Sequence, residues 1–244
     1  MMKRRWMLVT VAMLAVAPVQ ATTWGTDTVQ DPVSGKPCAV SSPASFGGYV
    51  YQWPEKYDQV FWPLTDPMGI WLCDASGFAT FIGDIELEEG EKQAIAALLR
   101  DAPRLPEQAT LAARLERLEA IYALRTLTPD ARSRILRALA YQYQSDGQQA
   151  RADALREQAR TLMEARLQDQ ALPLDLRLKY LFVTANYARE RGDAAEADRR
   201  LDALATRLRE AQKDDKVKDY AAYLDELIVP SRTIAPGGVL APEP

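Results

Sequence analysis

The spacing of hydrophobic positions divides the chain into regions of different character. Residues 6–17 form an apolar segment, and residues 22–86 mix short apolar stretches with Pro- and Gly-containing turns. That mixture is typical of short strands and irregular loops. From residue 87 to 229, apolar residues recur every three or four positions, which predicts amphipathic helices. The segment 230–244 is rich in proline and glycine and is expected to be disordered. The fold class predicted is α+β, mainly α.

Proline, glycine and capping residues set the expected helix boundaries. Pro103 ends the first helix, and the dipeptides Asp146-Gly147 and Gly192-Asp193 end two later ones. We expect helices over 89–100, 106–127, from 129 to Asp146, 148–170, from Pro173 to Gly192, 193–211, and from Asp214 or Asp215 to 229.

The region 22–86 is predicted to be a small β-rich module. Phe46–Trp53 has the composition of a strand, with room for a bulge at its two glycines. Ile70–Cys73 and Phe78–Ile82 are expected to pair as a hairpin joined by Asp74–Gly77. This module is too small to be very stable alone, so a disulfide or the following helices must help hold it.

The first 21 residues have the pattern of a signal peptide. Lys3, Arg4 and Arg5 precede the apolar segment, and the small residues before Ala21 suit signal peptidase. The alternative is a retained anchor, which the short apolar segment disfavours. We therefore expect cleavage after Ala21, no membrane anchor afterwards, and a periplasmic or secreted protein.

Composition narrows the chemistry of the mature chain. It contains no histidine, which removes the commonest general base and the usual zinc ligand. Loss of the three leader cations lowers the formal charge from −4 to −7. An acidic chain without basic clusters has no electrostatic reason to bind nucleic acid, so none is predicted as a partner.

Cys38 and Cys73 are the two cysteines. An even pair in an exported chain predicts a disulfide, which would close a loop of about 36 residues and contribute about 4 kcal/mol. The alternatives are two independent thiols or a redox pair, and the absence of a CxxC motif disfavours the latter.

Two segments of the helical region repeat with an offset of 45 residues. Aligned on Gly147 and Gly192, small residues recur seven positions before and five after each glycine. The stretch Tyr187–Ala197 resembles the tetratricopeptide family, which implies stacked helical hairpins with a groove for peptides or partner proteins. The alternative is a plain antiparallel bundle. Candidate groove residues, each of which could instead be a solvated surface position, are Arg137, Tyr141, Gln144, Lys179, Asn186 and Arg189.

A second resemblance involves Asp31–Gly35 and Cys73–Phe78. With cysteines at three more positions, the two segments are similar to the knuckles of an uncharacterised bacterial zinc-ribbon family that carries a helical array. The resemblance places the ligand sites at Asp31, Ser34, Cys73 and Ser76, of which only Cys73 is a thiol. Serine is a poor zinc ligand, so we predict no metal. Chance likeness between turn sequences is the alternative.

No catalytic residues and no cofactor are predicted. The segment Asp84–Glu91 carries five carboxylates, but it lies at a helix start, where acids favour the positive end of the dipole. Ser41, Ser42 and Ser45 have no partner base nearby.

The best functional hypothesis is an exported protein-binding scaffold of the bacterial envelope, with the aromatic module as a second contact surface. One alternative is an envelope enzyme, or an accessory subunit of one, that uses carboxylates near Asp84. Another is small-ligand binding by Tyr49, Tyr51, Trp53 and Trp62.

Overall fold

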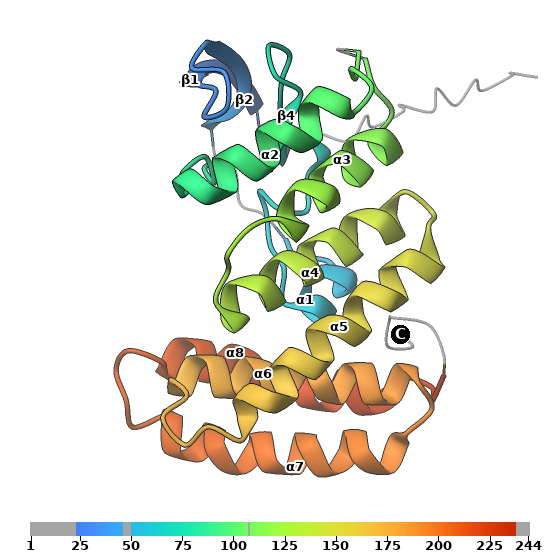
Figure 1. Ribbon diagram of the computed structural model, residues 1–244. Coiled ribbons are helices and arrows are strands. Elements are labelled where there is room, and N and C mark those ends of the chain that lie inside the picture. Colours follow the sequence, from blue (N-terminus) through green and yellow to red (C-terminus); the bar gives the residue numbers. More distant parts are fainter. Residues whose placement is uncertain (1–22, 46–49, 107, 238–244) are drawn as a thin grey trace, which may run out of the picture.

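The fold is α+β and mainly α, as the sequence predicts. A computed structural model describes residues 23–45, 50–106 and 108–237. Two antiparallel strand pairs lie at one end of the molecule, and the helices continue from them to the other end (Figure 1). The first pair is β1 (Thr23–Gln30) with β2 (Pro37–Ser45). The second is the predicted hairpin of β3 (Ile70–Cys73) with β4 (Phe78–Phe81).

The helices follow the predicted order, with one addition before the β3–β4 hairpin. A short 3-10 turn, η1 (Pro67–Gly69), also precedes β3. The α-helices are α1 (Trp53–Asp58), α2 (Glu89–Asp101), α3 (Leu111–Ala123), α4 (Pro129–Ser145), α5 (Gln149–Leu167), α6 (Leu174–Glu190), α7 (Ala194–Ala211) and α8 (Lys218–Thr233).

The pairs α4–α5 and α6–α7 form two matching helical hairpins. Gly147 and Gly192 stand at the two turns with φ values of 81° and 86°, a region that glycine adopts without strain. The next backbone N–H reaches back five residues in both hairpins, from Gln148 to the Tyr143 carbonyl and from Asp193 to the Ala188 carbonyl. The small residues flanking the turns are buried at the helix crossings: Ala140, Ala152, Ala185 and Ala197.

The strand pairs are joined to each other covalently and by tryptophan hydrogen bonds. Cys38 and Cys73 form the predicted disulfide, with a Cα–Cα distance of 5.2 Å. Trp71 Nε1 donates to the Ser41 carbonyl at 2.7 Å. These links fasten β2 to β3, so an isolated two-stranded ribbon becomes part of the common core.

The predicted strand Phe46–Trp53 is wrong where the structure describes it. Residues 46–49 lie outside the described part, residues 50–52 are not in a strand, and Trp53 begins α1. Gln52 and Glu55 form a capping box, and Pro54 suits the first turn of a helix. These local signals outweigh the β propensity of the neighbouring aromatic residues.

The C-terminal prediction is also wrong for residues 230–237. Helix α8 continues through Pro230 to Thr233, and Ile234 is buried beyond it. Burial of Leu227 and Ile228 on the same helix holds the chain against the array despite the missing proline N–H.

The start of α3 also differs from the prediction. Helix α3 starts after Thr110, whose hydroxyl caps it, and not at Pro106. The predicted leader, residues 1–21, lies outside the described part. Among the described helices, none has the length and apolarity needed to cross a membrane.

Candidate functional site

Several residues that were predicted to line a groove contact α1 of the same chain. Helix α1 lies between α4 and α6, and its backbone carbonyls are held by side chains of both (Figure 1). Arg137 Nη1 donates to the carbonyls of Asp58 at 2.6 Å and Gln59 at 2.9 Å. Asn186 Nδ2 donates to the Tyr57 carbonyl at 3.2 Å. These contacts satisfy the free carbonyls at the end of a short helix.

The Asp58 carboxylate and the Arg156 guanidinium form a buried ion pair between α1 and α5. Arg156 Nε donates to Asp58 Oδ1 at 3.0 Å, and Nη2 donates to Oδ2 at 2.6 Å. The two side chains are 0% and 2% exposed. Tyr187 donates to Asp58 Oδ1 at 2.6 Å, and Gln144 Oε1 accepts from Arg156 Nη2. Removing α1 would leave a buried charge without its partner, so α1 is a fixed part of this site.

The electrostatics of this pair favour its charged form. Burial alone would lower the pKa of Arg156, but the Asp58 carboxylate more than compensates, so the pKa is raised. Burial, together with the Asp58 charge, raises the pKa of the Tyr187 hydroxyl well above its usual value. Tyr187 therefore remains a hydrogen-bond donor to Asp58 throughout the physiological range.

Tyr57 links α1 to the end of α6. Its hydroxyl donates to Glu190 Oε2 at 2.7 Å, and its ring lies 5.4 Å from the Arg156 guanidinium carbon. Burial raises the pKa of the Glu190 carboxyl, and Arg156 opposes that shift.

The six predicted groove residues divide into three groups. Arg137, Gln144 and Asn186 contact α1 or its ion pair, as described above. The pKa of Tyr141 is raised by burial and by the charges of Glu55 and Asp58, which places its hydroxyl near α1.

Lys179 and Arg189 lie away from α1. Lys179 Nζ lies over the ring of Tyr220 on α8, 5.7 Å from its centroid. Arg189 bonds the Ile234 carbonyl and Asp198, so it holds the end of the chain instead of α1.

The sequence patterns did not predict Asp58, Arg156 or Glu190 as members of a site. Arg156 did carry a signal, because it occupies the apolar face of α5 between the buried residues Ala152 and Ala159. A charge in such a position needs a buried partner. No local pattern identified Asp58 as that partner.

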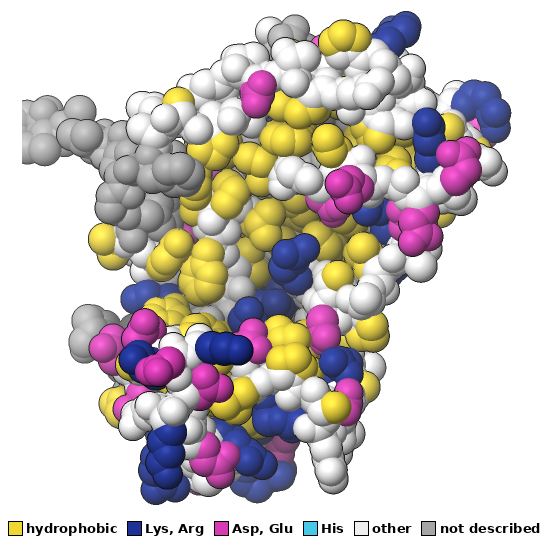
Figure 2. Space-filling view, turned by 90° about the vertical axis from the view of Figure 1, so that its left-hand side faces the viewer, with side chains coloured by type: hydrophobic (Ala, Val, Ile, Leu, Met, Phe, Trp, Pro, Cys, Tyr) yellow, Lys and Arg dark blue, Asp and Glu magenta, His cyan; other side chains and the backbone are white. Residues whose placement is uncertain are grey.

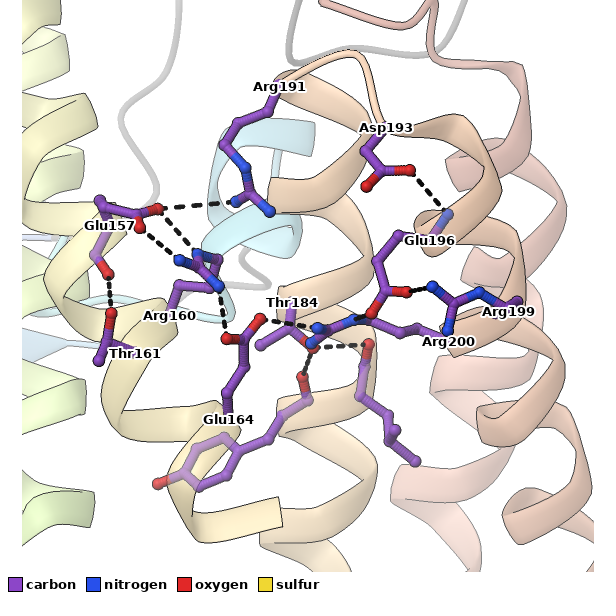
Figure 3. Close-up of polar contacts among 12 residues, drawn as sticks. Glu157, Arg160, Thr161, Glu164, Thr184, Arg191, Asp193, Glu196, Arg199 and Arg200 are labelled. Atoms are coloured by element: carbon purple, nitrogen blue, oxygen red, sulfur yellow. Dashed lines mark hydrogen bonds and ion pairs between the residues drawn. The ribbon is translucent and has the colours of Figure 1, made fainter. Parts of the chain in front are cut away.

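A cavity of about 330 Å³ opens beside the buried pair, between α5 and the end of α6. Arg191, directly after α6, reaches across to Glu157 of α5, with a distance of 3.7 Å between charged atoms (Figure 3). The residues lining the cavity are Asp153, Arg156, Glu157, Tyr187, Glu190 and Arg191.

A second cavity, of about 430 Å³, lies on the outer face of α5, α6 and α7. Its charged walls belong to a ladder in which acidic and basic side chains alternate (Figure 3). Arg160 bonds Glu157 and Glu164, and Arg200 bonds Glu164 and Glu196. Because these charges are mutually paired, the ladder serves to join α5 to α7.

The carboxylates near Asp84 are also engaged in structural contacts. Tyr122 donates to Asp84 Oδ2 at 2.7 Å, and Arg125 bonds both Asp84 and Glu91. The capping interpretation applies to Glu88 and Glu91, which form a capping box at the start of α2. The contacts therefore join β4 and α2 to α3.

The zinc-ribbon resemblance stays a prediction, and its four positions are engaged in other contacts or turns. Asp31 accepts from the N–H groups of Val33 and Ser34 and from the Ser34 hydroxyl, so it closes its own turn. Cys73 is in the disulfide, and Ser76 accepts from the Phe78 N–H. Within the described residues, no three potential ligands of the His, Cys, Asp or Glu type lie together.

Four half-buried rings form a row from the β-rich module to α8, which we call the aromatic row: Tyr51, Phe61, Tyr223 and Tyr220. Successive centroids are 4.6, 6.4 and 6.1 Å apart. In the space-filling view, hydrophobic side chains gather in a hollowed band between the upper and lower parts of the molecule (Figure 2).

The aromatic residues predicted to bind a small ligand are dispersed over separate contacts. Tyr51 belongs to the aromatic row, the Trp62 ring lies 5.6 Å from that of Trp24, and Trp53 begins α1. Tyr49 lies outside the described residues.

Comparison with family models, with curated proteins and with solved structures finds no match to this chain.

Proposed function

We propose that the protein is an exported scaffold of the bacterial cell envelope that binds a protein or peptide partner beside the aromatic row. The predicted leader and the disulfide support a location outside the cytoplasm. Helix α1 already contacts several of the predicted groove residues, so the partner docks next to it.

The observation that carries the proposal is a half-buried cation at the edge of an apolar surface. Among the described residues, Lys179 has no hydrogen bond or ion pair, and its ammonium contacts the ring of Tyr220. Burial lowers the pKa of Lys179. Val50, next to Tyr51 of the aromatic row, is 78% exposed. A partner that supplies a carboxylate and an apolar side chain would satisfy both features.

The chain shows the same recognition chemistry internally. The array binds α1 through an aromatic residue followed by an acidic one, Tyr57 and Asp58, with Arg156 as the cation that pairs with the Asp58 carboxylate. We therefore propose that the partner presents an aromatic or aliphatic residue close to an acidic residue. Lys179 would be the cation that pairs with it.

Site-specific crosslinking in a bacterial envelope tests this. A photo-crosslinking amino acid at Tyr223 should capture one dominant protein, whereas the same group at the exposed Asp225, on the other side of α8, should not. With the purified partner, Lys179→Glu should weaken binding at least about tenfold. Lys218→Glu, an exposed lysine on the same helix as Tyr223, is the matched control. Equal affinities of the two variants, or no capture at Tyr223, would disprove the proposal.

A further inference from the structure

The cavity beside the Asp58–Arg156 pair contains a polar atom that the fold leaves without a hydrogen bond. Arg156 lines the cavity, its Nε and Nη2 are engaged as described, and its Nη1 has no hydrogen-bond partner among the described residues. Asp153 Oδ1 and Glu190 Oε1 both lie 3.7 Å from Nη1, which is too long for a hydrogen bond. A buried donor of this kind is costly unless something accepts from it.

The charges around the cavity do not balance. Asp58, Asp153 and Glu190 all have a carboxylate oxygen within 3.7 Å of the one Arg156 guanidinium, so three carboxylates share a single cation. Glu157 at the rim contacts both Arg160 and Arg191. Burial raises the pKa of the Glu190 carboxyl, Arg156 and the Tyr57 hydroxyl oppose that rise, and the Asp153 and Asp58 charges add to it.

We infer that this cavity binds a small molecule that carries an ammonium group next to an oxygen acceptor, of which a free amino acid is the simplest example. The oxygen would accept from Arg156 Nη1, and the ammonium would donate to Glu190 and Asp153. A cavity of about 330 Å³ is at the small end of ligand sites and suits a molecule of this size. This inference does not rest on the proposed partner binding, which concerns Lys179 and the aromatic row.

Leucine and two of its derivatives test the ammonium contact separately from the oxygen contact. The full mature chain, residues 22–244, would be titrated by calorimetry with L-leucine, L-leucinamide and N-acetyl-L-leucine. Leucine and leucinamide retain both the ammonium and an oxygen acceptor and should bind saturably. N-acetyl-leucine lacks the ammonium, so its affinity should be at least about tenfold lower.

Two variants locate the site. Glu190→Gln keeps the acceptor for Tyr57 but removes the charge, and should weaken leucine binding at least about tenfold. Asp153 lies on the open side of the cavity, and its side chain is 52% exposed. Asp153→Asn therefore removes the second carboxylate proposed to bind the ammonium, and serves as the test if Glu190→Gln fails to fold. Glu116→Gln removes a carboxylate from a different cavity on α3 and should leave binding unchanged.

Several results would overturn the inference. The first is the absence of saturable binding of leucine and leucinamide up to about 10 mM. The second is N-acetyl-leucine binding as tightly as leucine. The third is wild-type affinity in both cavity variants, which would place any binding elsewhere.

Discussion

Arg156 holds both carboxylate oxygens of Asp58, a residue 98 positions earlier in the chain. This pair joins α1, which follows the first strand pair, to α5 of the helical array. Because both charges are buried, each depends on the other.

Substitution of one member of this pair should therefore strongly lower the stability of the folded protein. Asp58→Asn removes the one carboxylate that is hydrogen-bonded to the buried Arg156 guanidinium and leaves only the longer contacts to Asp153 and Glu190, so it should lower the free energy of unfolding by about 3–5 kcal/mol. Urea unfolding followed by circular dichroism would measure this. The double variant with Arg156→Met should recover part of the loss, because no buried charge remains.

An exposed ion pair provides the control. Arg207 and Glu210 pair on the surface of α7, and Arg207→Gln should change the free energy of unfolding by less than about 1 kcal/mol. A loss of less than 1 kcal/mol for Asp58→Asn as well would show that the buried pair does not hold the two parts together.

The half-buried carboxyl of Glu190 and the buried carboxyl of Glu91 should give opposite dependences of stability on pH. Burial raises the pKa of Glu190. Burial would also raise that of Glu91, but the N–H groups of Thr126 and Glu88, with Arg125, lower it. A raised pKa means that the folded state binds the proton more tightly, so the contribution of Glu190 is complete below about pH 4.3 and lost as the pH rises. The contribution of Glu91 is present above about pH 4.3 and lost as the pH falls.

Urea unfolding of Glu190→Gln and Glu91→Gln between about pH 4 and pH 7 would measure the difference. Relative to the wild type, Glu190→Gln should gain stability as the pH rises, whereas Glu91→Gln should lose it. Parallel pH profiles for the two variants would show that these environments are assigned wrongly.

The disulfide should contribute strongly to stability because the two strand pairs that it links have little hydrophobic core of their own. Replacing Cys38 and Cys73 together by serine should lower the free energy of unfolding by about 4 kcal/mol. Reduced wild-type protein is the matched control and should behave like the double variant. If the oxidised and reduced proteins unfold at the same urea concentration, the hydrogen bonds of Trp71 and the helices suffice to hold β2.

Gly69 should be intolerant of a side chain for a steric reason. A Cβ at this position would lie 2.2 Å from the Pro63 carbonyl oxygen. Gly69→Ala should lower the free energy of unfolding by about 1–3 kcal/mol. Gly90→Ala is the control, because nothing lies within 4 Å of its Cβ and alanine favours the helix by about 0.5–1 kcal/mol. A Gly69→Ala variant as stable as the wild type would contradict this packing.

Local signals explain why most helices could be predicted. The start of α4 depends on the Thr128 hydroxyl, which accepts from the Ala131 N–H, followed by Pro129. The turns at Gly147 and Gly192 likewise depend on one residue type in a left-handed conformation. Such features involve neighbours in sequence, so the sequence contains all the information needed to place them.

The remaining elements depend on partners far along the chain. Strand β1 has few apolar residues and is mostly exposed, so no alternation indicated it. Helix α1 has six residues, and its carbonyls are satisfied by Arg137 and Asn186 from distant helices. Four of the six predicted groove residues do lie near α1 or its ion pair, so they contact a segment of the same chain and not a separate partner.

The sequence separations of these contacts also imply an order of assembly. Cys38 and Cys73 are 35 positions apart, whereas Tyr57 and Asp58 wait for partners as far as Asn186 and Tyr187, 129 positions later. When the chain emerges with its N-terminus first, the Cys38–Cys73 disulfide can form while the Asp58 side chain is still solvated. Only the arrival of α6 completes the pocket around it, so the last third of the polypeptide decides when the first third becomes fully native.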